Sequence, residues 1–353
     1  MTFDLRSDFL GPPPAAMLEA MAAAAAQPDG FELRENSHQR ALEAYAANLL
    51  GKPDALLFPT CTMANLVAVM AQSRPGETII GDAESHCLTS ETGGIAAIAG
   101  AMPRGLAGHN GQLPLDQLRA LLEASPDPQR MPARLVLLET THNRSGGLPL
   151  PLDHIGQVSD LAHRSGAALH IDGARFFNAA LALGVSPADM AAPATTISLS
   201  LNKGLCAPNG ALLVGPRDII ARALILRQQL GGGIRPAGAI AAAGLVALET
   251  MLPQLQRDHD NARALIAALG ELGLAAGPAA LSTNIVLVDL GLSRAGVDAF
   301  LAALATQQVL AIAFGPGRIR LCLHRGIHAS AIPAIAAAFQ VALTASGVLK
   351  QEK

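Results

Sequence analysis

Lysine and large aromatic residues are scarce in this chain. Its 353 residues include four lysines, one tyrosine and no tryptophan, and only 15% of the residues are charged. Lys350 and Lys353 stand in the last four residues, and Lys52 stands in a Gly-Lys-Pro turn. A reaction that needs a desolvated amine therefore has few places to occur, and Lys203 is the remaining candidate.

A strong charge and long apolar runs are also lacking. The formal net charge is −3 without a basic stripe, so we expect no nucleic-acid partner, because such binding depends on clustered Lys and Arg. The longest apolar stretch, 237–248, is shorter than the roughly 20 residues that cross a bilayer and predicts a buried helix. Residues 1–8 mix acidic and basic side chains, unlike a signal peptide, so we expect a cytoplasmic protein without a membrane contact.

Metal-binding patterns are missing too. The four cysteines are widely spaced and form no C-x-x-C pair, which predicts reduced thiols and neither a zinc site nor a disulfide framework. His324 and His328 are four residues apart, but they follow a predicted strand and have no third ligand nearby. We therefore predict no metal site. The cysteines are Cys61, Cys87, Cys206 and Cys322.

The order of apolar runs predicts an α/β fold. Short runs rich in Ile, Val and Leu alternate with segments of helical period, which is typical of a mostly parallel central sheet covered by helices. A helix-forming region at 236–270 and a mixture of strands and helices beyond it favour a second, smaller α+β domain at the C-terminus. We expect a large domain at 15–248, and an N-terminal arm at 1–14 that accompanies a small domain at 249–353. The predicted strands are 78–80, 135–139, 168–172, 196–201, 211–214, 284–289 and 318–324.

Polar residues follow four of the apolar runs, where open α/β sheets bind their ligands. An amine, a carboxylate and a helix N-terminus at adjacent strand ends are the groups that pyridoxal 5'-phosphate (PLP) needs. The amine forms a Schiff base, the carboxylate keeps the pyridine nitrogen protonated, and the helix N-terminus binds the phosphate. The segments are Pro59-Thr-Cys-Thr62, Glu139-Thr-Thr-His-Asn-Arg-Ser-Gly-Gly147, Asp172-Gly-Ala-Arg175 and Asn202-Lys-Gly204.

Longer motifs point to a family. In order, they are Leu5-Arg-Ser-Asp8, the segment 139–147, His170-Ile-Asp-Gly-Ala-Arg175, Lys203-Gly-Leu-Cys-Ala-Pro208 and Leu230-Gly-Gly-Gly-Ile-Arg235. With these motifs the chain resembles the low-specificity L-threonine aldolases, which are PLP-dependent enzymes of the aspartate-aminotransferase fold type (fold type I). The resemblance covers essentially the whole chain and implies PLP as the cofactor.

The resemblance also implies which residues hold the cofactor. Lys203 matches the Schiff-base lysine, and Asp172 matches the partner of the pyridine nitrogen. His86 matches a histidine that stacks on the ring close to the substrate hydroxyl, and it is our candidate base because an imidazole titrates near neutral pH. Cys61 and Thr62 take the positions of the phosphate loop.

Further matches concern the substrate and the neighbouring subunit. Ser7, Arg175 and Arg320 match the grip on the substrate carboxylate, with Arg175 also placed next to the cofactor. His142 matches a second histidine near the β-hydroxyl. Arg235 matches an arginine that reaches the phosphate bound by another subunit, which implies a homo-oligomer, a dimer or a tetramer, with active sites at the subunit interface.

The implied reaction is retro-aldol cleavage of a β-hydroxy-α-amino acid, of the L-threonine or L-allo-threonine type, into glycine and an aldehyde. Three positions depart from the family: Cys61 replaces a glycine, Asn202 replaces a serine, and Leu33 replaces a tyrosine that could stack or donate a hydrogen bond. The side chain of the preferred substrate therefore does not follow from the resemblance. A β-eliminating lyase or racemase, and a catalytically weak paralogue, stay open as alternatives.

Overall fold

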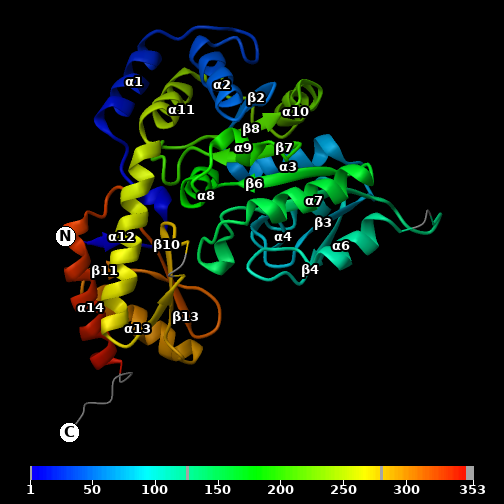
Figure 1. Ribbon diagram of the computed structural model, residues 1–353. Helices are drawn as coiled ribbons and strands as arrows, with labels where there is room; N and C mark the ends of the chain where they lie inside the picture. Colours follow the sequence, from blue (N-terminus) through cyan, green and yellow to red (C-terminus); the bar gives the residue numbers. More distant parts are fainter. Residues whose placement is uncertain (1, 125–126, 279–280, 347–353) are drawn as a thin grey trace.

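A seven-stranded sheet forms the centre of the computed structural model, which describes residues 2–124, 127–278 and 281–346 (Figure 1). Its strands are β2 (Asp54–Phe58), β3 (Thr78–Asp82), β4 (Met102–Leu106), β5 (Ala133–Glu139), β6 (Ala168–Gly173), β7 (Thr196–Ser200) and β8 (Ala211–Gly215). Their order is β2-β8-β7-β6-β5-β3-β4. Within this sheet β8 runs antiparallel to the other six strands, so the predicted mostly parallel α/β fold is confirmed.

Helices cover both faces of the sheet because successive side chains of a strand point to opposite sides. Leu57 packs with one set of helices, whereas the next residue, Phe58, packs with the other. The first set includes α2 (Ser37–Leu49), α6 (Leu115–Leu122), α7 (Leu152–Arg164), α8 (Phe176–Leu183) and α9 (Pro187–Ala191). The second set includes α3 (Cys61–Gln72), α5 (Gly94–Ala97) and α10 (Arg217–Gln229). The short α4 (His86–Thr89) follows β3.

The apolar stretch 237–248 lies in α11 (Gly238–Thr250), which packs between α1 (Ala15–Ala26) and α2, mostly buried as predicted. The helical region ends at Thr250 and resumes as α12 (Leu252–Glu271), which leads away from the large sheet (Figure 1). Among the described residues no single helix is long and apolar enough to cross a membrane. The pair α11 and α12 meets both criteria together but is bent by 66°.

A second hydrophobic core lies around a small antiparallel sheet. This sheet has the order β12 (Ile312–Ala313), β13 (Arg318–Cys322), β10 (Ile285–Asp289) and β9 (Ala275–Gly277), and α12, α13 (Arg294–Thr306) and α14 (Ile332–Ala345) cover it. In the N-terminal arm, β1 (Phe3–Asp4) pairs with β11 (Val309–Leu310), and Leu5 is buried in the same core. This pairing brings Ser7 and Asp8 to the edge of the large domain. The exact domain limits stay a prediction.

Candidate active site

The carboxyl ends of β5, β6 and β7 bring three polar residues into register. Glu139 pairs with Asp172, and Asp172 pairs with Ser198. Because parallel strands end at the same edge of a sheet, these side chains share one region, as expected for a binding site of an α/β protein. A cavity of about 200 Å3 lies here. It is lined by Thr60, Cys61, Thr62, Asn65, His86, Glu91, Asp172, Ala174, Ser200, Asn202 and Lys203.

A lysine and a carboxylate face this cavity together. Asp172 is buried, and its two oxygens accept hydrogen bonds from the Ala174 amide and from Asn65 Nδ2, each over 3.1 Å. Lys203 lies just beyond β7 and is only partly buried. The Lys52 amine is used elsewhere, since it donates to the Ala194 carbonyl over 2.6 Å. PLP requires an amine for the Schiff base and a carboxylate for the pyridine nitrogen, and this cavity offers both.

The N-terminus of α3 supplies the third element. The Thr60 hydroxyl accepts a hydrogen bond from the Met63 amide over 3.2 Å, while the Cys61 and Thr62 amides have no protein acceptor within the described ranges. Free N–H groups and the helix dipole favour a phosphate at this position. Burial, and next the charge of Asp172, raise the pKa of the Cys61 thiol to about 12, so the thiol stays neutral beside an anion. These residues fit PLP.

His86 begins α4 and is paired with an acid that the sequence did not reveal. Its Nδ1 lies 3.1 Å from Glu91 Oε1, and the imidazole is 36% exposed whereas Glu91 is buried. The hydrogen bond to Glu91 raises the pKa of His86, with a further contribution from the charge of Asp172. Burial raises the pKa of Glu91. His86, Glu91 and Asp172 each offer a ligand atom within 4.8 Å of the others, inside the cavity that also contains Lys203.

Glu139 fixes the segments on either side of this edge. Its carboxylate accepts hydrogen bonds from the His86 amide over 2.6 Å and from the Asn143 amide over 2.8 Å. Burial raises the pKa of Glu139. One side chain thus holds the start of α4 to the loop that follows β5.

His142 is not among the residues that line the cavity. The side chain is 3% exposed, with Nδ1 2.7 Å from the Ser145 hydroxyl and Nε2 3.4 Å from Asp82 Oδ1. Gly111 packs against the ring so closely that a Cβ there would lie 2.6 Å from His142 Cγ. Burial opposes protonation of His142, but the neighbouring acids Asp82, Glu139 and Glu84 together outweigh burial and raise the pKa of His142. The contact of His142 with the substrate stays a prediction.

Arg175 forms a buried ion pair that the sequence did not reveal. Its Nε and Nη2 donate to the two oxygens of Asp8, each over 2.8 Å, and Asn284 donates to Asp8 over 2.9 Å. Burial opposes ionisation of Asp8, but the charge and hydrogen bonds of Arg175 outweigh it and hold the pKa well below its usual range. Ser7 is buried next to this pair, with its hydroxyl 3.4 Å from Asp8 Oδ1.

Arg320 reaches the same region from β13. Its Nη1 donates to Asn143 Oδ1 over 2.8 Å, its Nη2 donates to the Arg6 carbonyl over 3.1 Å, and its buried Nε has no partner among the described residues. The guanidinium carbon lies 4.7 Å from the centre of the Phe314 ring, and that of Arg144 lies 4.8 Å from the same ring. Arg320 is thus held in place with donors still available for a carboxylate.

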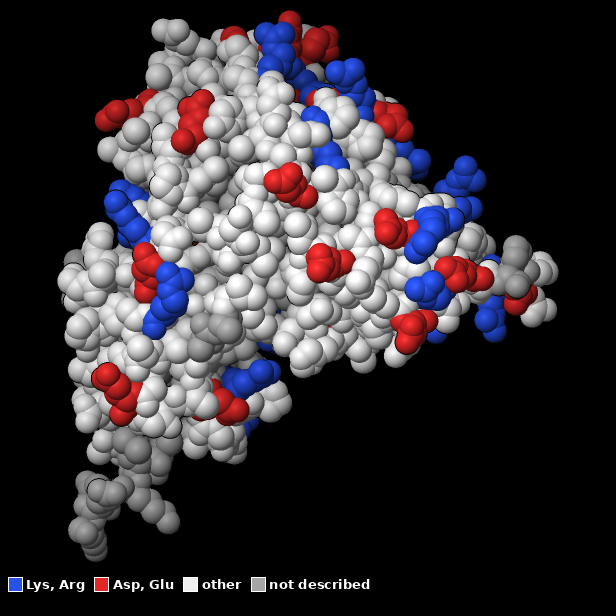
Figure 2. Space-filling view, in the orientation of Figure 1, with Lys and Arg blue, Asp and Glu red and all other residues white. Residues whose placement is uncertain are grey.

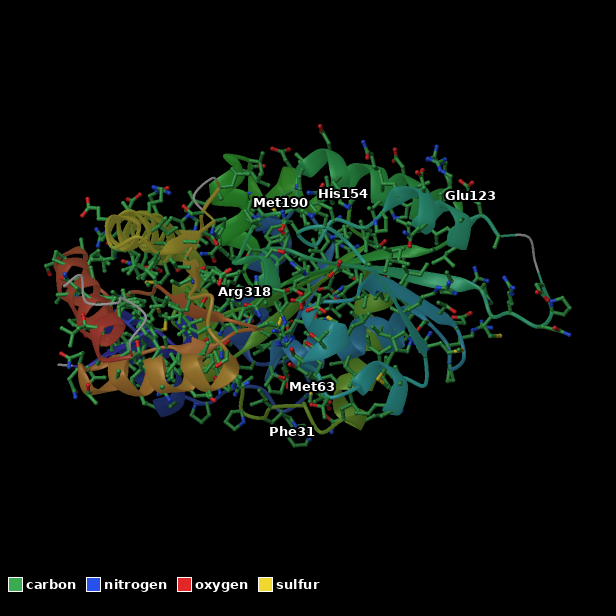
Figure 3. The ribbon with its side chains drawn as sticks, turned by 90° about the horizontal axis from the view of Figure 1, so that it is seen from below. Phe31, Met63, Glu123, His154, Met190 and Arg318 are labelled. Carbon is green, nitrogen blue, oxygen red and sulfur yellow. The ribbon has the colours of Figure 1, made fainter. Side chains whose placement is uncertain are left out.

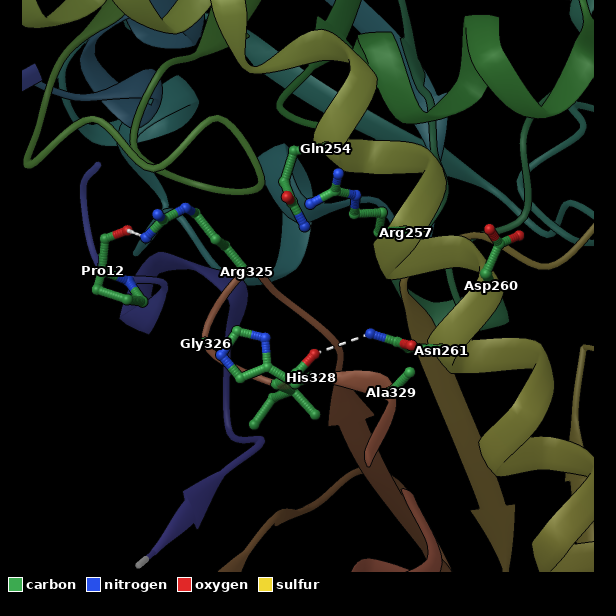
Figure 4. A pocket seen from close by; sticks show the side chains of 10 residues that line it. Pro12, Gln254, Arg257, Asp260, Asn261, Arg325, Gly326, His328 and Ala329 are labelled. Carbon is green, nitrogen blue, oxygen red and sulfur yellow. Dashed lines mark hydrogen bonds between the residues drawn. The ribbon is translucent and has the colours of Figure 1, made fainter. Parts of the chain in front are cut away.

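Five of the predicted site residues do not line this cavity: Ser7, His142, Arg175, Arg235 and Arg320. Arg235 is exposed on the loop after α10, and Leu33 lies near Gly233 of the same loop. A cleft of about 510 Å³ is also separate from this cavity: it lies between Pro12, α12 and the loop after β13, where Arg325 donates to the Pro12 carbonyl (Figure 4). It includes neither Lys203 nor Asp172.

The fold and the cavity define a PLP-dependent enzyme of fold type I. A structure of Leishmania major threonine aldolase is similar to this chain, with a TM-score of 0.84 at 20% identity, covering 96% of this chain and 98% of that one. A structure of SPT with PLP has a TM-score of 0.79 at 21% identity and covers 99% of this chain and 89% of that one. These likenesses concern the fold.

Sequence comparison identifies the family. The family model of beta-eliminating lyases matches residues 4–292. Low-specificity L-threonine aldolase 1 of Arabidopsis thaliana is 37% identical over 346 residues, 96% of each chain, and the low specificity L-threonine aldolase of Escherichia coli K12 is 39% identical over 290 residues, 82% of this chain and 84% of that one. The chain belongs to this family of PLP-dependent lyases, and the predicted resemblance, cofactor and enzyme class are confirmed.

Proposed function

We propose that this chain cleaves β-hydroxy-α-amino acids of the L-threonine and L-allo-threonine type into glycine and an aldehyde. The observation that carries the proposal is the meeting of Lys203, Asp172, His86 and the N-terminus of α3 at one cavity of about 200 Å3, in a chain of this family. When bound, PLP supplies an electron-withdrawing ring that takes up the electron pair released when the Cα–Cβ bond breaks.

The cofactor-binding residues follow from the geometry. Lys203 would hold the cofactor covalently, the Asp172 carboxylate would keep a proton on the pyridine nitrogen, and the amides of Cys61 and Thr62 would bind the phosphate. Asn65 holds Asp172 in orientation through the 3.1 Å hydrogen bond.

The remaining groups orient the substrate and move its protons. Arg320, with Arg175 and Ser7 beside it, would bind the carboxylate, because a guanidinium can hold a carboxylate through two hydrogen bonds. His86 would accept the proton of the β-hydroxyl, the oxygen would form the aldehyde carbonyl as the Cα–Cβ bond breaks, and Cα would gain a proton to give glycine. His142 would assist near the β-hydroxyl, as the family resemblance implies.

Product analysis tests this proposal. Incubation of the PLP-loaded protein with L-allo-threonine should yield acetaldehyde and glycine in equal amounts, and Lys203→Ala should yield neither. The family model that matches the chain is named for β-elimination, which makes that reaction the second candidate. 2-Oxobutyrate and ammonia as the main products would favour the second candidate. A protein that stays colourless with added PLP would instead be the weak paralogue.

We also propose a homo-oligomer in which Arg235 serves the active site of a second copy. The exposed position of Arg235 supports this arrangement, and so do exposed apolar side chains on the surface. Leu18 is 50% and Phe31 is 79% exposed, and Phe31 lies at the edge of the molecule in Figure 3. Figure 2 shows charges of both signs interleaved on one face. Mixing Arg235→Ala with Lys203→Ala subunits should restore activity that each variant lacks. If the mixture stays inactive, the shared site is contradicted.

We also propose a cytoplasmic location, which cell fractionation tests.

A further inference from the structure

A network of hydrogen-bonded side chains at the wall of the cavity ends at His86. Asn65 is at its centre, 1% exposed in the middle of α3. Its Nδ2 is 3.1 Å from Asp172 Oδ2 and 2.9 Å from Glu91 Oε1, and its Oδ1 is 2.6 Å from the Ser198 hydroxyl. Glu91 Oε1 is in turn 3.1 Å from His86 Nδ1.

The direction of each hydrogen bond follows from the two carboxylates. Ionised carboxylates only accept, so both must face the amide nitrogen of Asn65, and its oxygen must face donors. One of those donors is His170 Nε2, 3.1 Å away, and burial lowers the pKa of His170 to about 4, which keeps that ring neutral. The Asn65 amide is thereby fixed, and it always presents N–H groups to Glu91.

Glu91 Oε1 therefore receives two hydrogen bonds, one from Asn65 and one from the His86 ring. Burial raises the pKa of Glu91, while the hydrogen bonds from His86 and Asn65 act against burial and favour the charged carboxylate. When Oε1 accepts from His86, the imidazole proton is on Nδ1. His86 Nε2 then has a lone pair and no protein partner within the described ranges.

We propose that Glu91 is a positioning residue that holds the His86 proton on Nδ1, increases the basicity of the ring, and so leaves Nε2 as the atom that accepts the substrate proton. This inference rests on the proposed function for the role of His86 as the base. The other charged groups that face His86 are Asp172, which adds to the effect of Glu91, and Lys203, which opposes it; Glu139 contacts only its backbone amide.

Two substitutions of Glu91 separate the effect of its charge on the pKa of His86 from its effect on the tautomer of that ring. Glu91→Gln keeps an oxygen that Asn65 orients toward Nδ1 but removes the charge, so the pKa of His86 should fall by about 1 unit while the tautomer is retained. Glu91→Leu removes the acceptor, so the proton should distribute over both ring nitrogens. Glu84→Gln is the matched control, because Glu84 is an exposed acid two residues before His86 that contacts Arg144 at 3.8 Å.

The measurement is nitrogen NMR of the PLP-loaded protein labelled with ring-15N histidine, without substrate, with the His86 signals assigned by their loss in His86→Phe. We expect a protonated Nδ1 and an unprotonated Nε2 in the wild type and in Glu84→Gln, and the two changes described above in the Glu91 variants. A wild-type ring protonated on Nε2, or a His86 titration that Glu91→Gln leaves unmoved, would overturn the inference.

Kinetics give the second readout. The acid limb of the pH profile for aldehyde formation should move with the NMR titration in Glu91→Gln, and kcat should fall about tenfold or more with KM little changed, since base catalysis contributes at least this much. If Glu91→Gln does not fold, Glu91→Asp is the second variant, because it withdraws the charge by one methylene. It should shift the pKa of His86 by less and with the same sign, and an unmoved titration would again refute the role. If the wild type releases no aldehyde, the proposed function fails, while the NMR result still decides the role of Glu91.

Discussion

The Asp8–Arg175 pair links the N-terminal arm to the large domain, and its removal should cost much stability. Asp8 is fully buried and makes two hydrogen bonds to Arg175 over 2.8 Å. In Asp8→Asn either orientation of the amide places its nitrogen against a guanidinium N–H, and Arg175 stays buried without a counter-charge. Breaking a buried pair in this way costs about 3–5 kcal/mol. The midpoint of urea unfolding, followed by circular dichroism, should fall accordingly.

The pKa of Asp8 determines how its contribution to stability depends on pH. The pKa of Asp8 in the folded protein is below its ordinary value of 3.8, so its contribution is fully present above that value and is lost as pH falls through the folded pKa. The difference between the wild type and Asp8→Asn should therefore be constant near neutral pH and shrink below about pH 4.

The same arm provides a matched control. Asp4 and Arg6 make a similar two-bond pair, at 2.6 and 2.8 Å, but in an exposed position. Asp4→Asn should leave the unfolding midpoint nearly unchanged, because solvent screens exposed pairs. Equal losses in Asp4→Asn and Asp8→Asn, or no loss in Asp8→Asn, would refute the reasoning. The apolar double variant Asp8→Leu/Arg175→Met should recover much of the loss.

Three further predictions concern the pH response, a loop and the carboxylate grip. Burial raises the pKa of Asp258 from 3.8 to about 7, so its contribution to stability is fully present below the ordinary value and is lost as pH rises through the folded pKa; urea unfolding at pH 8.5 should show Asp258→Asn more stable than the wild type, and equal stability would contradict the burial argument. Gly111→Ala should lower the thermal midpoint, because Gly111 has φ +80° and its Cβ would meet the His142 ring; the control Gly93→Ala has a similar φ but open space, and equal losses would rule out the clash. Phe314→Leu should raise KM several-fold with kcat nearly kept, since loss of the ring under Arg320 costs about 1 kcal/mol; an unchanged KM in steady-state assays would disprove the contact's role.

The core of the site could be predicted from the sequence because local patterns determine it. Asp172 lies at the end of the apolar strand β6, Lys203 lies shortly after the apolar strand β7, and parallel strands end at one edge. The helix after β2 could be predicted from the Thr60-Cys61-Thr62 segment after an apolar run. The direction of β8 could not, because an apolar run carries no information on whether a strand is parallel. The apolar pattern did not predict β4, because four of its five residues are exposed and it lies at the sheet edge.

The groups that orient these residues could not be predicted in the same way. Asp8 meets Arg175 from 167 positions away, and Glu91 meets Asn65 from 26 positions away. Long-range contacts of this kind depend on the tertiary fold and leave no periodic signal. One local sign was available, because Asn65 is a polar residue in an otherwise apolar stretch of α3, and a buried amide needs partners.

The central claim is that Lys203 holds the cofactor of a PLP-dependent aldolase. Borohydride reduction of the PLP-loaded protein, followed by peptide mass spectrometry, tests it most directly because reduction makes the link between cofactor and lysine permanent. We predict one pyridoxyl group per chain on the peptide that contains Lys203, and no pyridoxyl group on the corresponding peptide of Lys203→Ala. Labelling of Lys52 instead, or no labelling of a wild type that forms acetaldehyde and glycine, would contradict the account.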